Sequence, residues 1–96
     1  MPYQVLITAD AQRDLEALRA YDRRIILQAI ETHLTHQPTL VTRRRIKQLV
    51  QPAISQYRLR VRDYRVYYDV DEEAQHVVII QVFEKGRSTT PSEGEP

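Results

Sequence analysis

Residues 57–71 read YRLRVRDYRVYYDVD, two runs of alternating apolar and polar side chains that meet at Arg62-Asp63. A period of two predicts β-strands, and two such runs joined by two residues predict a hairpin. Directly opposed residues of a hairpin share a face. One face would carry the apolar set that a core requires, namely Tyr57, Leu59, Val61, Tyr64, Val66 and Tyr68. The other face would carry Arg58, Arg60, Arg65 and Tyr67.

The charged face is the informative feature of this hairpin. A slip of one residue would bury three arginines, so the pattern specifies which face is buried. Arg60 and Arg65 would lie directly opposite each other, and their repulsion costs a few tenths to about 1 kcal/mol. One interpretation is a surface for a polyanion, with guanidinium groups on phosphates and Tyr67 as a platform for a stacked base. The other is a solvated sheet face, with Arg58 packed on Tyr67 through a cation–π contact.

The chain before the hairpin predicts one strand and two helices. Residues 3–8, YQVLIT, are typical of a strand, and Thr8 or Asp10 can cap a helix after it. A second cap at Asp22 predicts another helix, which ends before Pro38 because the residue preceding proline avoids the α region. The short link between the helices predicts an antiparallel helical hairpin. Their apolar stripes are Ala11, Leu15 and Leu18, then Ile26, Ala29, Ile30 and Leu34.

The remaining strands complete the predicted fold. Residues 46–50 predict a short strand, and residues 77–83 predict a last strand that is apolar on both faces and therefore central. The order, β-α-α-β-β-β in outline, predicts an α+β domain with a two-helix hairpin packed on one face of a small antiparallel β-sheet. We expect this domain to span residues 1–86. Residues 87–96 are small, polar and turn-forming, and we expect a flexible tail there.

Positive charge is concentrated in the middle of the chain. The 96 residues have a formal net charge of +1, but residues 43–65 contain eight basic side chains and one acidic side chain. Arg43, Arg44, Arg45 and Lys47 precede the hairpin and would extend its positive surface, or else protect an exposed sheet edge from aggregation. Twelve of the 14 basic residues are arginine, whose planar group suits phosphate and does not release a proton near neutral pH.

Other chemistry is weakly represented. The absence of cysteine excludes disulfides, thiolate metal sites and cysteine nucleophiles, and it fits a reducing compartment. His33 and His36 have a spacing that can hold a metal but lack an evident third ligand, so we expect no metal site and no cofactor. The longest apolar run, residues 77–80, is too short for a membrane helix, and residues 1–10 do not resemble a signal peptide. We therefore expect a soluble cytoplasmic protein that does not enter a membrane.

The chain resembles the RelE/ParE family of toxins from bacterial type II toxin–antitoxin systems. The resemblance is carried by YQVLITADAQRDLEAL at residues 3–18, IKQL at 46–49, the hairpin at 57–71 and VVIIQVFEKGRS at 77–88. It implies a toxin that is neutralised by an antitoxin from the adjacent gene. Members of the RelE branch cut mRNA in the ribosomal A site, by attack of a 2′-hydroxyl on the adjacent phosphate, and so inhibit translation. Members of the ParE branch inhibit DNA gyrase and lack the nuclease residues.

The resemblance also implies site residues. The two basic positions of the family's third strand fall on Arg58 and Arg60, the arginine after the turn tyrosine falls on Arg65, and the basic residue after the last strand falls on Lys85 or Arg87. RelE members often have lysines at the first two positions, where this chain has arginines, and a tyrosine near the C-terminus, where residues 86–96 of this chain have no aromatic residue. A guanidinium is a poor base, so Lys85 is the expected proton donor or acceptor. We assign catalysis to Arg58, Arg60, Arg65 and Lys85, and RNA binding to Arg43, Arg44, Arg45, Lys47, Tyr67 and Arg87.

Three functions are consistent with this sequence. The first is a ribosome-dependent mRNA endoribonuclease, which the arginine-rich hairpin favours. The second is a ParE-like gyrase inhibitor, a protein-binding toxin without enzymatic activity. The absence of both a general base and a C-terminal tyrosine favours this function. The third is a non-toxic relative that acts only by binding the antitoxin. In each case we expect a hetero-oligomer with the antitoxin, whose acidic or amphipathic segment would cover the arginines.

Overall fold

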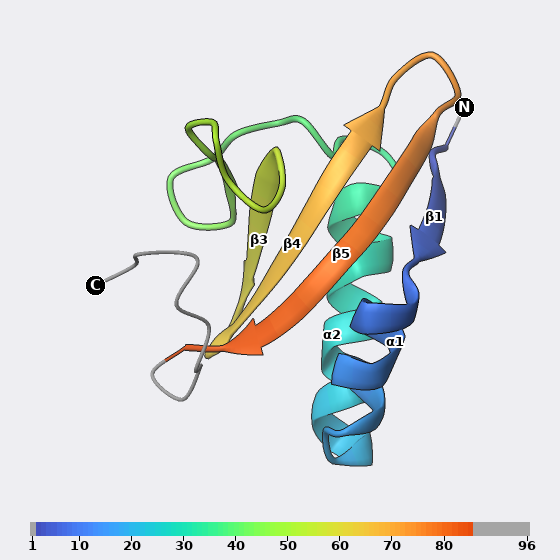
Figure 1. The fold of residues 1–96 in the computed structure, drawn as a ribbon, viewed down its shortest axis with the longest axis vertical. Helices are drawn as coiled ribbons and strands as arrows, with labels where there is room; N and C mark the ends of the chain where they lie inside the picture. Colours follow the sequence, from blue (N-terminus) through green and yellow to red (C-terminus); the bar gives the residue numbers. More distant parts are fainter. Residues whose placement is uncertain (1, 86–96) are drawn as a thin grey trace.

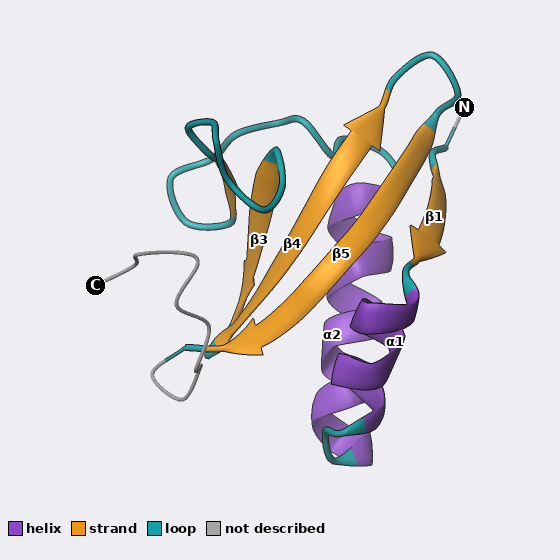
Figure 2. Cartoon of the chain, viewed as in Figure 1, coloured by secondary structure: helices purple, strands orange, loops and turns teal. Residues whose placement is uncertain are grey.

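The computed structural model describes residues 2–85, which form two helices against a five-stranded sheet (Figure 1). The helices lie together on one side of the strands (Figure 2). In chain order the elements are β1 (Gln4–Ile7), α1 (Ala9–Glu16), α2 (Ala20–Leu34), β2 (Ile46–Gln48), β3 (Tyr57–Val61), β4 (Tyr64–Asp71) and β5 (His76–Glu84). The predicted α+β class, with a helical hairpin followed by strands, is confirmed. Four strands, β2 to β5, follow the helices, each at a predicted position, which is one strand more than the order β-α-α-β-β-β counts.

The sheet has the strand order β1-β5-β4-β3-β2 and is mixed. The pairs among β2, β3, β4 and β5 are antiparallel, as predicted. β1 instead runs parallel to β5, from Gln4 opposite His76 to Ile7 opposite Ile79, so the prediction of an antiparallel sheet is wrong for this strand. Parallel neighbours need a long connection, and the chain between β1 and β5 contains both helices and three strands. β5 is an interior strand, as predicted, with β1 on one side and β4 on the other.

The hairpin of β3 and β4 has the predicted register. Its turn places Arg62 at a φ of 55°, in the left-handed region that residues other than glycine rarely adopt. A bulge then shifts β4 against β5, so that Tyr67 lies opposite Gln81 while Tyr68 lies opposite Ile79. The pairs within the hairpin are Tyr57–Tyr68, Arg58–Tyr67, Leu59–Val66, Arg60–Arg65 and Val61–Tyr64.

The predicted apolar face of the hairpin is part of the core between sheet and helices. Leu59, Val66 and Tyr68 are fully buried. The hydroxyl of Tyr68 donates to the carbonyl of Pro38 (2.6 Å), which satisfies that polar group and attaches the chain after α2 to the sheet. The core cluster consists of Ala11, Leu15, Ile26, Ile30, Leu34, Ile46, Leu59, Val61, Tyr64, Val66, Tyr68, Val77, Ile79 and Val82. These residues include most of the helical stripes that the sequence predicts, and their burial stabilises the two layers.

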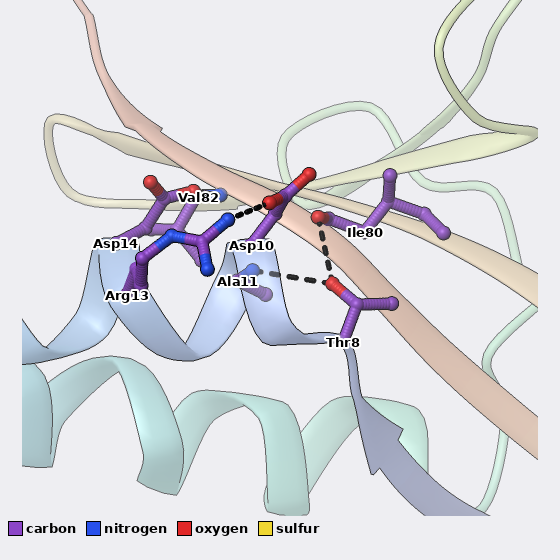
Figure 3. A network of polar contacts seen from close by, with 7 residues as sticks. All are labelled: Thr8, Asp10, Ala11, Arg13, Asp14, Ile80 and Val82. Carbon is purple, nitrogen blue, oxygen red and sulfur yellow. Dashed lines mark hydrogen bonds and ion pairs between the residues drawn. The ribbon is translucent and has the colours of Figure 1, made fainter.

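α1 is attached to the edge of β5 beyond the end of β1 (Figure 3). The hydroxyl of Thr8 accepts a hydrogen bond from the N–H of Ala11 (3.1 Å), which confirms Thr8 as the cap of the first helix. The same hydroxyl donates to the carbonyl of Ile80 (3.0 Å), and the carboxylate of Asp14 accepts from the N–H of Val82 (2.9 Å). These contacts satisfy backbone groups of β5 that β1 is too short to pair.

The second helix starts earlier than the sequence predicts. α2 begins at Ala20 after the cap residue Arg19, whose side chain makes no capping hydrogen bond. Asp22, the predicted cap, lies in the first turn, where a carboxylate suits the helix dipole. Its carboxylate accepts a hydrogen bond from the hydroxyl of Tyr64 (2.8 Å). The prediction of Asp22 as the cap is wrong because α2 already begins at Ala20, and the Asp22 side chain instead contacts Tyr64 on the sheet and Arg19.

Three further predictions concern the strand at residues 46–50, the domain boundary at residue 86 and the tail at 87–96. The predicted strand over residues 46–50 is confirmed for Ile46–Gln48. The predicted domain boundary at residue 86 and the tail at 87–96 lie outside the described residues. Within residues 2–85, neither helix is long and apolar enough to cross a membrane.

Candidate nucleic-acid interface

The charged side chains of the hairpin lie on the face of the sheet opposite the core. Paired residues of adjacent antiparallel strands share a face, so the register defines two rows that cross the strands. The first row contains Lys47, Arg58, Tyr67 and Gln81, and the second contains Arg60, Arg65 and Phe83. We term the surface of these two rows the arginine face. The predicted separation of charged and apolar faces is therefore confirmed.

A turn of three arginines borders the arginine face. It comprises residues 43–45, between Thr42 and β2, and we term it the arginine turn. The Thr42 hydroxyl accepts hydrogen bonds from the N–H groups of Arg45 (3.0 Å) and Ile46 (3.2 Å), and the Thr42 N–H donates to the Ile46 carbonyl (3.0 Å). The N–H of Arg60 donates to the carbonyl of Arg45 (2.8 Å), which attaches the turn to β3. The backbone of the arginine turn is thus fixed while its side chains are exposed.

The arginine turn and the arginine face enclose a cationic pocket of about 240 Å³. Its lining includes eight of the ten site residues that the sequence predicts, drawn from the turn, the hairpin and the end of β5. The lining residues are Thr42, Arg43, Arg44, Arg45, Ile46, Lys47, Arg58, Arg60, Arg65 and Lys85. Positive side chains around one pocket repel one another, and an anion in the pocket would relieve that repulsion. The geometry is therefore that of an anion-binding site.

Arg65 is held in place by its own hairpin. Its guanidinium donates to the carbonyls of Arg62 (3.2 Å) and Tyr64 (3.0 Å). Burial lowers the pKa of Arg65, and the positive charges of Arg58 and Arg60 lower it further. A guanidinium nevertheless stays protonated at neutral pH, so Arg65 presents a fixed positive charge. A donor held in this way can stabilise charge that develops during a reaction without first reorganising.

Lys85 reaches the cationic pocket from the end of β5. Its N–H donates to the carbonyl of Asp63 in the hairpin turn (2.6 Å), which fixes its backbone beside that turn. The side chain is exposed and lines the same pocket as Arg58 and Arg65. An ammonium group can exchange a proton, which a guanidinium does not do at neutral pH. Arg87, also predicted to bind RNA, lies outside the described residues.

Tyr67 does not offer the stacking surface that the sequence predicts. It lies on the arginine face opposite Arg58 but is only 3% exposed. Its ring contacts Phe83 edge to face, with centroids 5.5 Å apart. The prediction fails because alternation along β4 shows which face a residue occupies and not what β5 places beside it. Sequence reasoning missed Phe83, whose half-buried ring lies opposite Arg65 on this face.

The cationic pocket offers a limited set of chemical groups. Among its described lining residues there is no carboxylate and no imidazole. Within residues 2–85, no group of three or more His, Cys, Asp or Glu side chains is placed to hold a metal ion. The groups present can bind and polarise a phosphate through guanidinium donors, and Lys85 can exchange protons.

Solved structures with this fold include toxins of toxin–antitoxin systems. The chain is similar to one in the RelBE2 toxin–antitoxin complex of Mycobacterium tuberculosis, with 29% identity and a TM-score of 0.73 over 88% of this chain and 100% of that one. It is similar to one in the archaeal RelE–RelB complex of Pyrococcus horikoshii, with 26% identity and a TM-score of 0.73 over 92% and 100% of the two chains. A mutant of the E. coli toxin RelE in the free state shares the fold at 20% identity and a TM-score of 0.68, over 93% of this chain and 88% of that one.

A family model gives the assignment. No curated protein matches the chain. The model of the ParE toxin of the type II toxin–antitoxin system parDE matches residues 5–88, which include all the described strands and helices except the first residue of β1. The chain therefore belongs to the RelE/ParE family and is a toxin of a type II toxin–antitoxin system.

Proposed function

We propose that this toxin is a ribosome-dependent mRNA endoribonuclease that cleaves A-site codons and so inhibits translation. The observation that carries the proposal is the cationic pocket, which brings Arg58, Arg60 and Arg65 together with Lys85. The similarity to RelE–RelB and RelBE2 complexes supports the RelE branch of the family. The ribosome would align the mRNA on this exposed face, so the toxin need supply only charge stabilisation and a proton.

The proposed reaction is a transesterification within RNA. The 2′-oxygen of one nucleotide attacks the adjacent phosphorus, and the bond from phosphorus to the 5′-oxygen of the next nucleotide breaks. A 2′,3′-cyclic phosphate and a 5′-hydroxyl result. Arg58, Arg60 and Arg65 would bind the non-bridging oxygens and stabilise the charge of the transition state. Lys85 would donate a proton to the leaving 5′-oxygen, while the attacking hydroxyl releases its proton to water.

The test is to map mRNA 5′ ends by primer extension on stalled, translating ribosomes, with and without the purified toxin. We expect discrete cuts within the A-site codon that are absent on free RNA. Intact mRNA, with toxin that still arrests growth when expressed, would overturn the proposal.

A ParE-like gyrase inhibitor is the second candidate, and one observation favours it. The family model that matches residues 5–88 is that of a ParE toxin. The arginine face would then dock on gyrase rather than on RNA. Expression would cause gyrase-dependent DNA damage and an SOS response, with mRNA 5′ ends unchanged. A harmless phenotype on strong expression would instead favour a relative that only binds its antitoxin.

An antitoxin is the proposed partner in each case. The similar chains from M. tuberculosis and P. horikoshii come from toxin–antitoxin complexes. We propose that an acidic or amphipathic antitoxin segment covers the arginine face of this toxin and competes with its target. Purification of the toxin with its antitoxin as a hetero-oligomer, and release of toxicity on substitution of the antitoxin's acidic residues, would test this.

A further inference from the structure

A second pocket lies against the arginine turn. It has a volume of about 460 Å³ and is formed by the end of α2, the chain that follows it and the arginine turn. We term it the histidine pocket. Its lining includes Thr32, His33, His36 and Gln37, together with the three arginines of the arginine turn. We propose that the histidine pocket binds a backbone phosphate of the same polynucleotide whose reacting phosphate occupies the cationic pocket, an inference that rests on the proposed function.

The two pockets share one wall. Residues 42–46 line both of them, so the arginine turn stands between the arginine face and the end of α2. The hydrogen bonds of Thr42 and Arg60 hold the backbone of this wall. A single strand of nucleic acid carries one negative charge per nucleotide and follows a positively charged groove. A strand that leaves the cationic pocket across the arginine turn reaches the histidine pocket next.

The lining of the histidine pocket suits a phosphodiester. The guanidinium groups of the arginine turn offer paired N–H donors, and the side chains of Thr32 and Gln37 offer further polar contacts. No carboxylate occurs among its described lining residues, so an anion meets no full like charge there. The C-terminal end of α2 adds a partial negative charge of about half a unit, which three full positive charges outweigh.

His33 links the histidine pocket to pH. It is half-buried, and the charged or titratable groups that line the pocket with it are His36, after the end of α2, and Arg43, Arg44 and Arg45 of the turn. Burial lowers the pKa of His33, and the charge of Arg45 lowers it further. His33 is therefore neutral near pH 7. A phosphate beside it would favour its protonation, so phosphate and proton binding strengthen each other as pH falls.

Imidazole resonances give a direct test. We would titrate the full-length toxin with a short 2′-O-methyl oligoribonucleotide, which lacks a free 2′-hydroxyl and cannot be cleaved, and record the histidine signals by NMR. The chain has three histidines, and the third, His76, is the first residue of β5, does not line the pocket and serves as an internal control. We expect the signals of His33 and His36 to move on titration and those of His76 to stay unchanged.

Variants test how much His33 contributes to oligonucleotide binding. We expect the oligonucleotide to bind the wild-type toxin about 3- to 10-fold more tightly at pH 6 than at pH 8, as a charge-assisted hydrogen bond allows. His33→Gln should remove most of this dependence and, at pH 6, lower the slope of log affinity against log salt by about 0.7. His76→Gln should change neither quantity. His36 is exposed, so His36→Gln remains informative if the His33 variant does not fold.

The outcomes separate this inference from the proposed function. Movement of the His33 and His36 signals, with loss of pH dependence in the His33→Gln variant and not in His76→Gln, supports the inference even if mRNA on ribosomes stays intact. Unmoved signals, while Arg58→Ala with Arg60→Ala abolishes oligonucleotide binding, would overturn it. If these signals move with inorganic phosphate and not with the oligonucleotide, the pocket binds free phosphate and the proposal of a polynucleotide is overturned. Movement only with a glutamate-rich peptide would overturn it in favour of an acidic protein segment.

Discussion

The two faces of the β3–β4 hairpin differ in what they contribute to the protein. Leu59 and Val66 are fully buried in the core, whereas their sequence neighbours Arg60 and Arg65 lie opposite each other on the arginine face. Burial of apolar area stabilises the fold, whereas two like charges across a strand pair destabilise it. Residues that stabilise the core and residues of the proposed binding surface are therefore separated by single-residue steps along each strand of the hairpin. Substitutions at adjacent positions should consequently affect different properties, namely stability on the core face and activity on the arginine face.

The largest expected effect is on activity and comes from the arginine face. Arg58→Ala combined with Arg60→Ala should lower the rate of A-site cleavage by about 1,000-fold or more, because each donor to the transition state is worth about 10²–10³. The thermal unfolding temperature should not fall. Primer extension on stalled ribosomes under single-turnover conditions measures the rate, and circular dichroism measures unfolding.

Arg24→Ala is the matched control for this variant. Arg24 is exposed on α2, in the helical layer on the other side of the sheet, and its loss should leave cleavage unchanged. Full cleavage by the folded double variant would show that the arginine face is not the catalytic surface. Equal losses in both variants would point to a general effect of net charge.

Substitution on the core face of β3 should lower stability. Leu59→Ala should lower the free energy of unfolding by about 3 kcal/mol, because it removes a fully buried side chain and leaves a cavity between sheet and helices. Urea unfolding measures this. Arg60→Ala, one position away and exposed, is the comparison and should change stability by less than about 0.5 kcal/mol. Similar losses at the two positions would contradict the separation of the faces.

The register of the hairpin was predictable because residues within the hairpin determine it. A period of two, an apolar set and a two-residue turn fix the register from Tyr57–Tyr68 to Val61–Tyr64 without reference to the rest of the chain. The convergence of Arg58, Arg60, Arg65 and Lys85 required the family resemblance, because no spacing in the sequence relates β5 to the hairpin. The catalytic and binding roles assigned to these residues stay predictions.

The parts that sequence reasoning missed depend on contacts distant in sequence. The parallel pairing of β1 follows from its place beside β5, which no local pattern encodes. Tyr67 is buried, and its ring contacts Phe83, which β5 brings beside it. Asp22 accepts from the Tyr64 hydroxyl on the sheet instead of capping its own helix. The histidine pocket likewise lies between the end of α2 and the arginine turn, and the sequence indicates only that this turn is basic.

The core face also has a pH dependence at alkaline pH. Burial raises the pKa of Tyr64 from 10.0 to about 12, and the hydrogen bond to Asp22 adds to the increase. Above pH 10 the unfolded chain loses this proton before the folded protein does, so stability falls between pH 10 and 12. Tyr64→Phe should lower stability by about 1 kcal/mol at neutral pH through the lost hydrogen bond and should weaken this alkaline decline.

Urea unfolding at neutral pH and just above pH 10 measures both effects in the Tyr64→Phe variant. Burial also raises the pKa of Tyr68, so part of the alkaline decline should persist in the variant. Tyr21→Phe is the control, since Tyr21 is 58% exposed on α2 and its replacement should alter neither quantity. An alkaline decline identical to that of the wild type would show that Tyr64 is not protected in the folded state.

The smallest expected effect tests the cost of the arginine face itself. Arg60→Thr removes one of two directly opposed cations and introduces a β-branched residue, so it should stabilise the fold by a few tenths to about 1 kcal/mol at low salt. The gain should shrink as salt screens the repulsion between the remaining charges. Arg60→Lys keeps the charge and should bring no such salt-dependent gain. If salt does not reduce the stability gained by Arg60→Thr, the gain comes from the strand propensity of threonine. The charges of the arginine face would then not destabilise the fold.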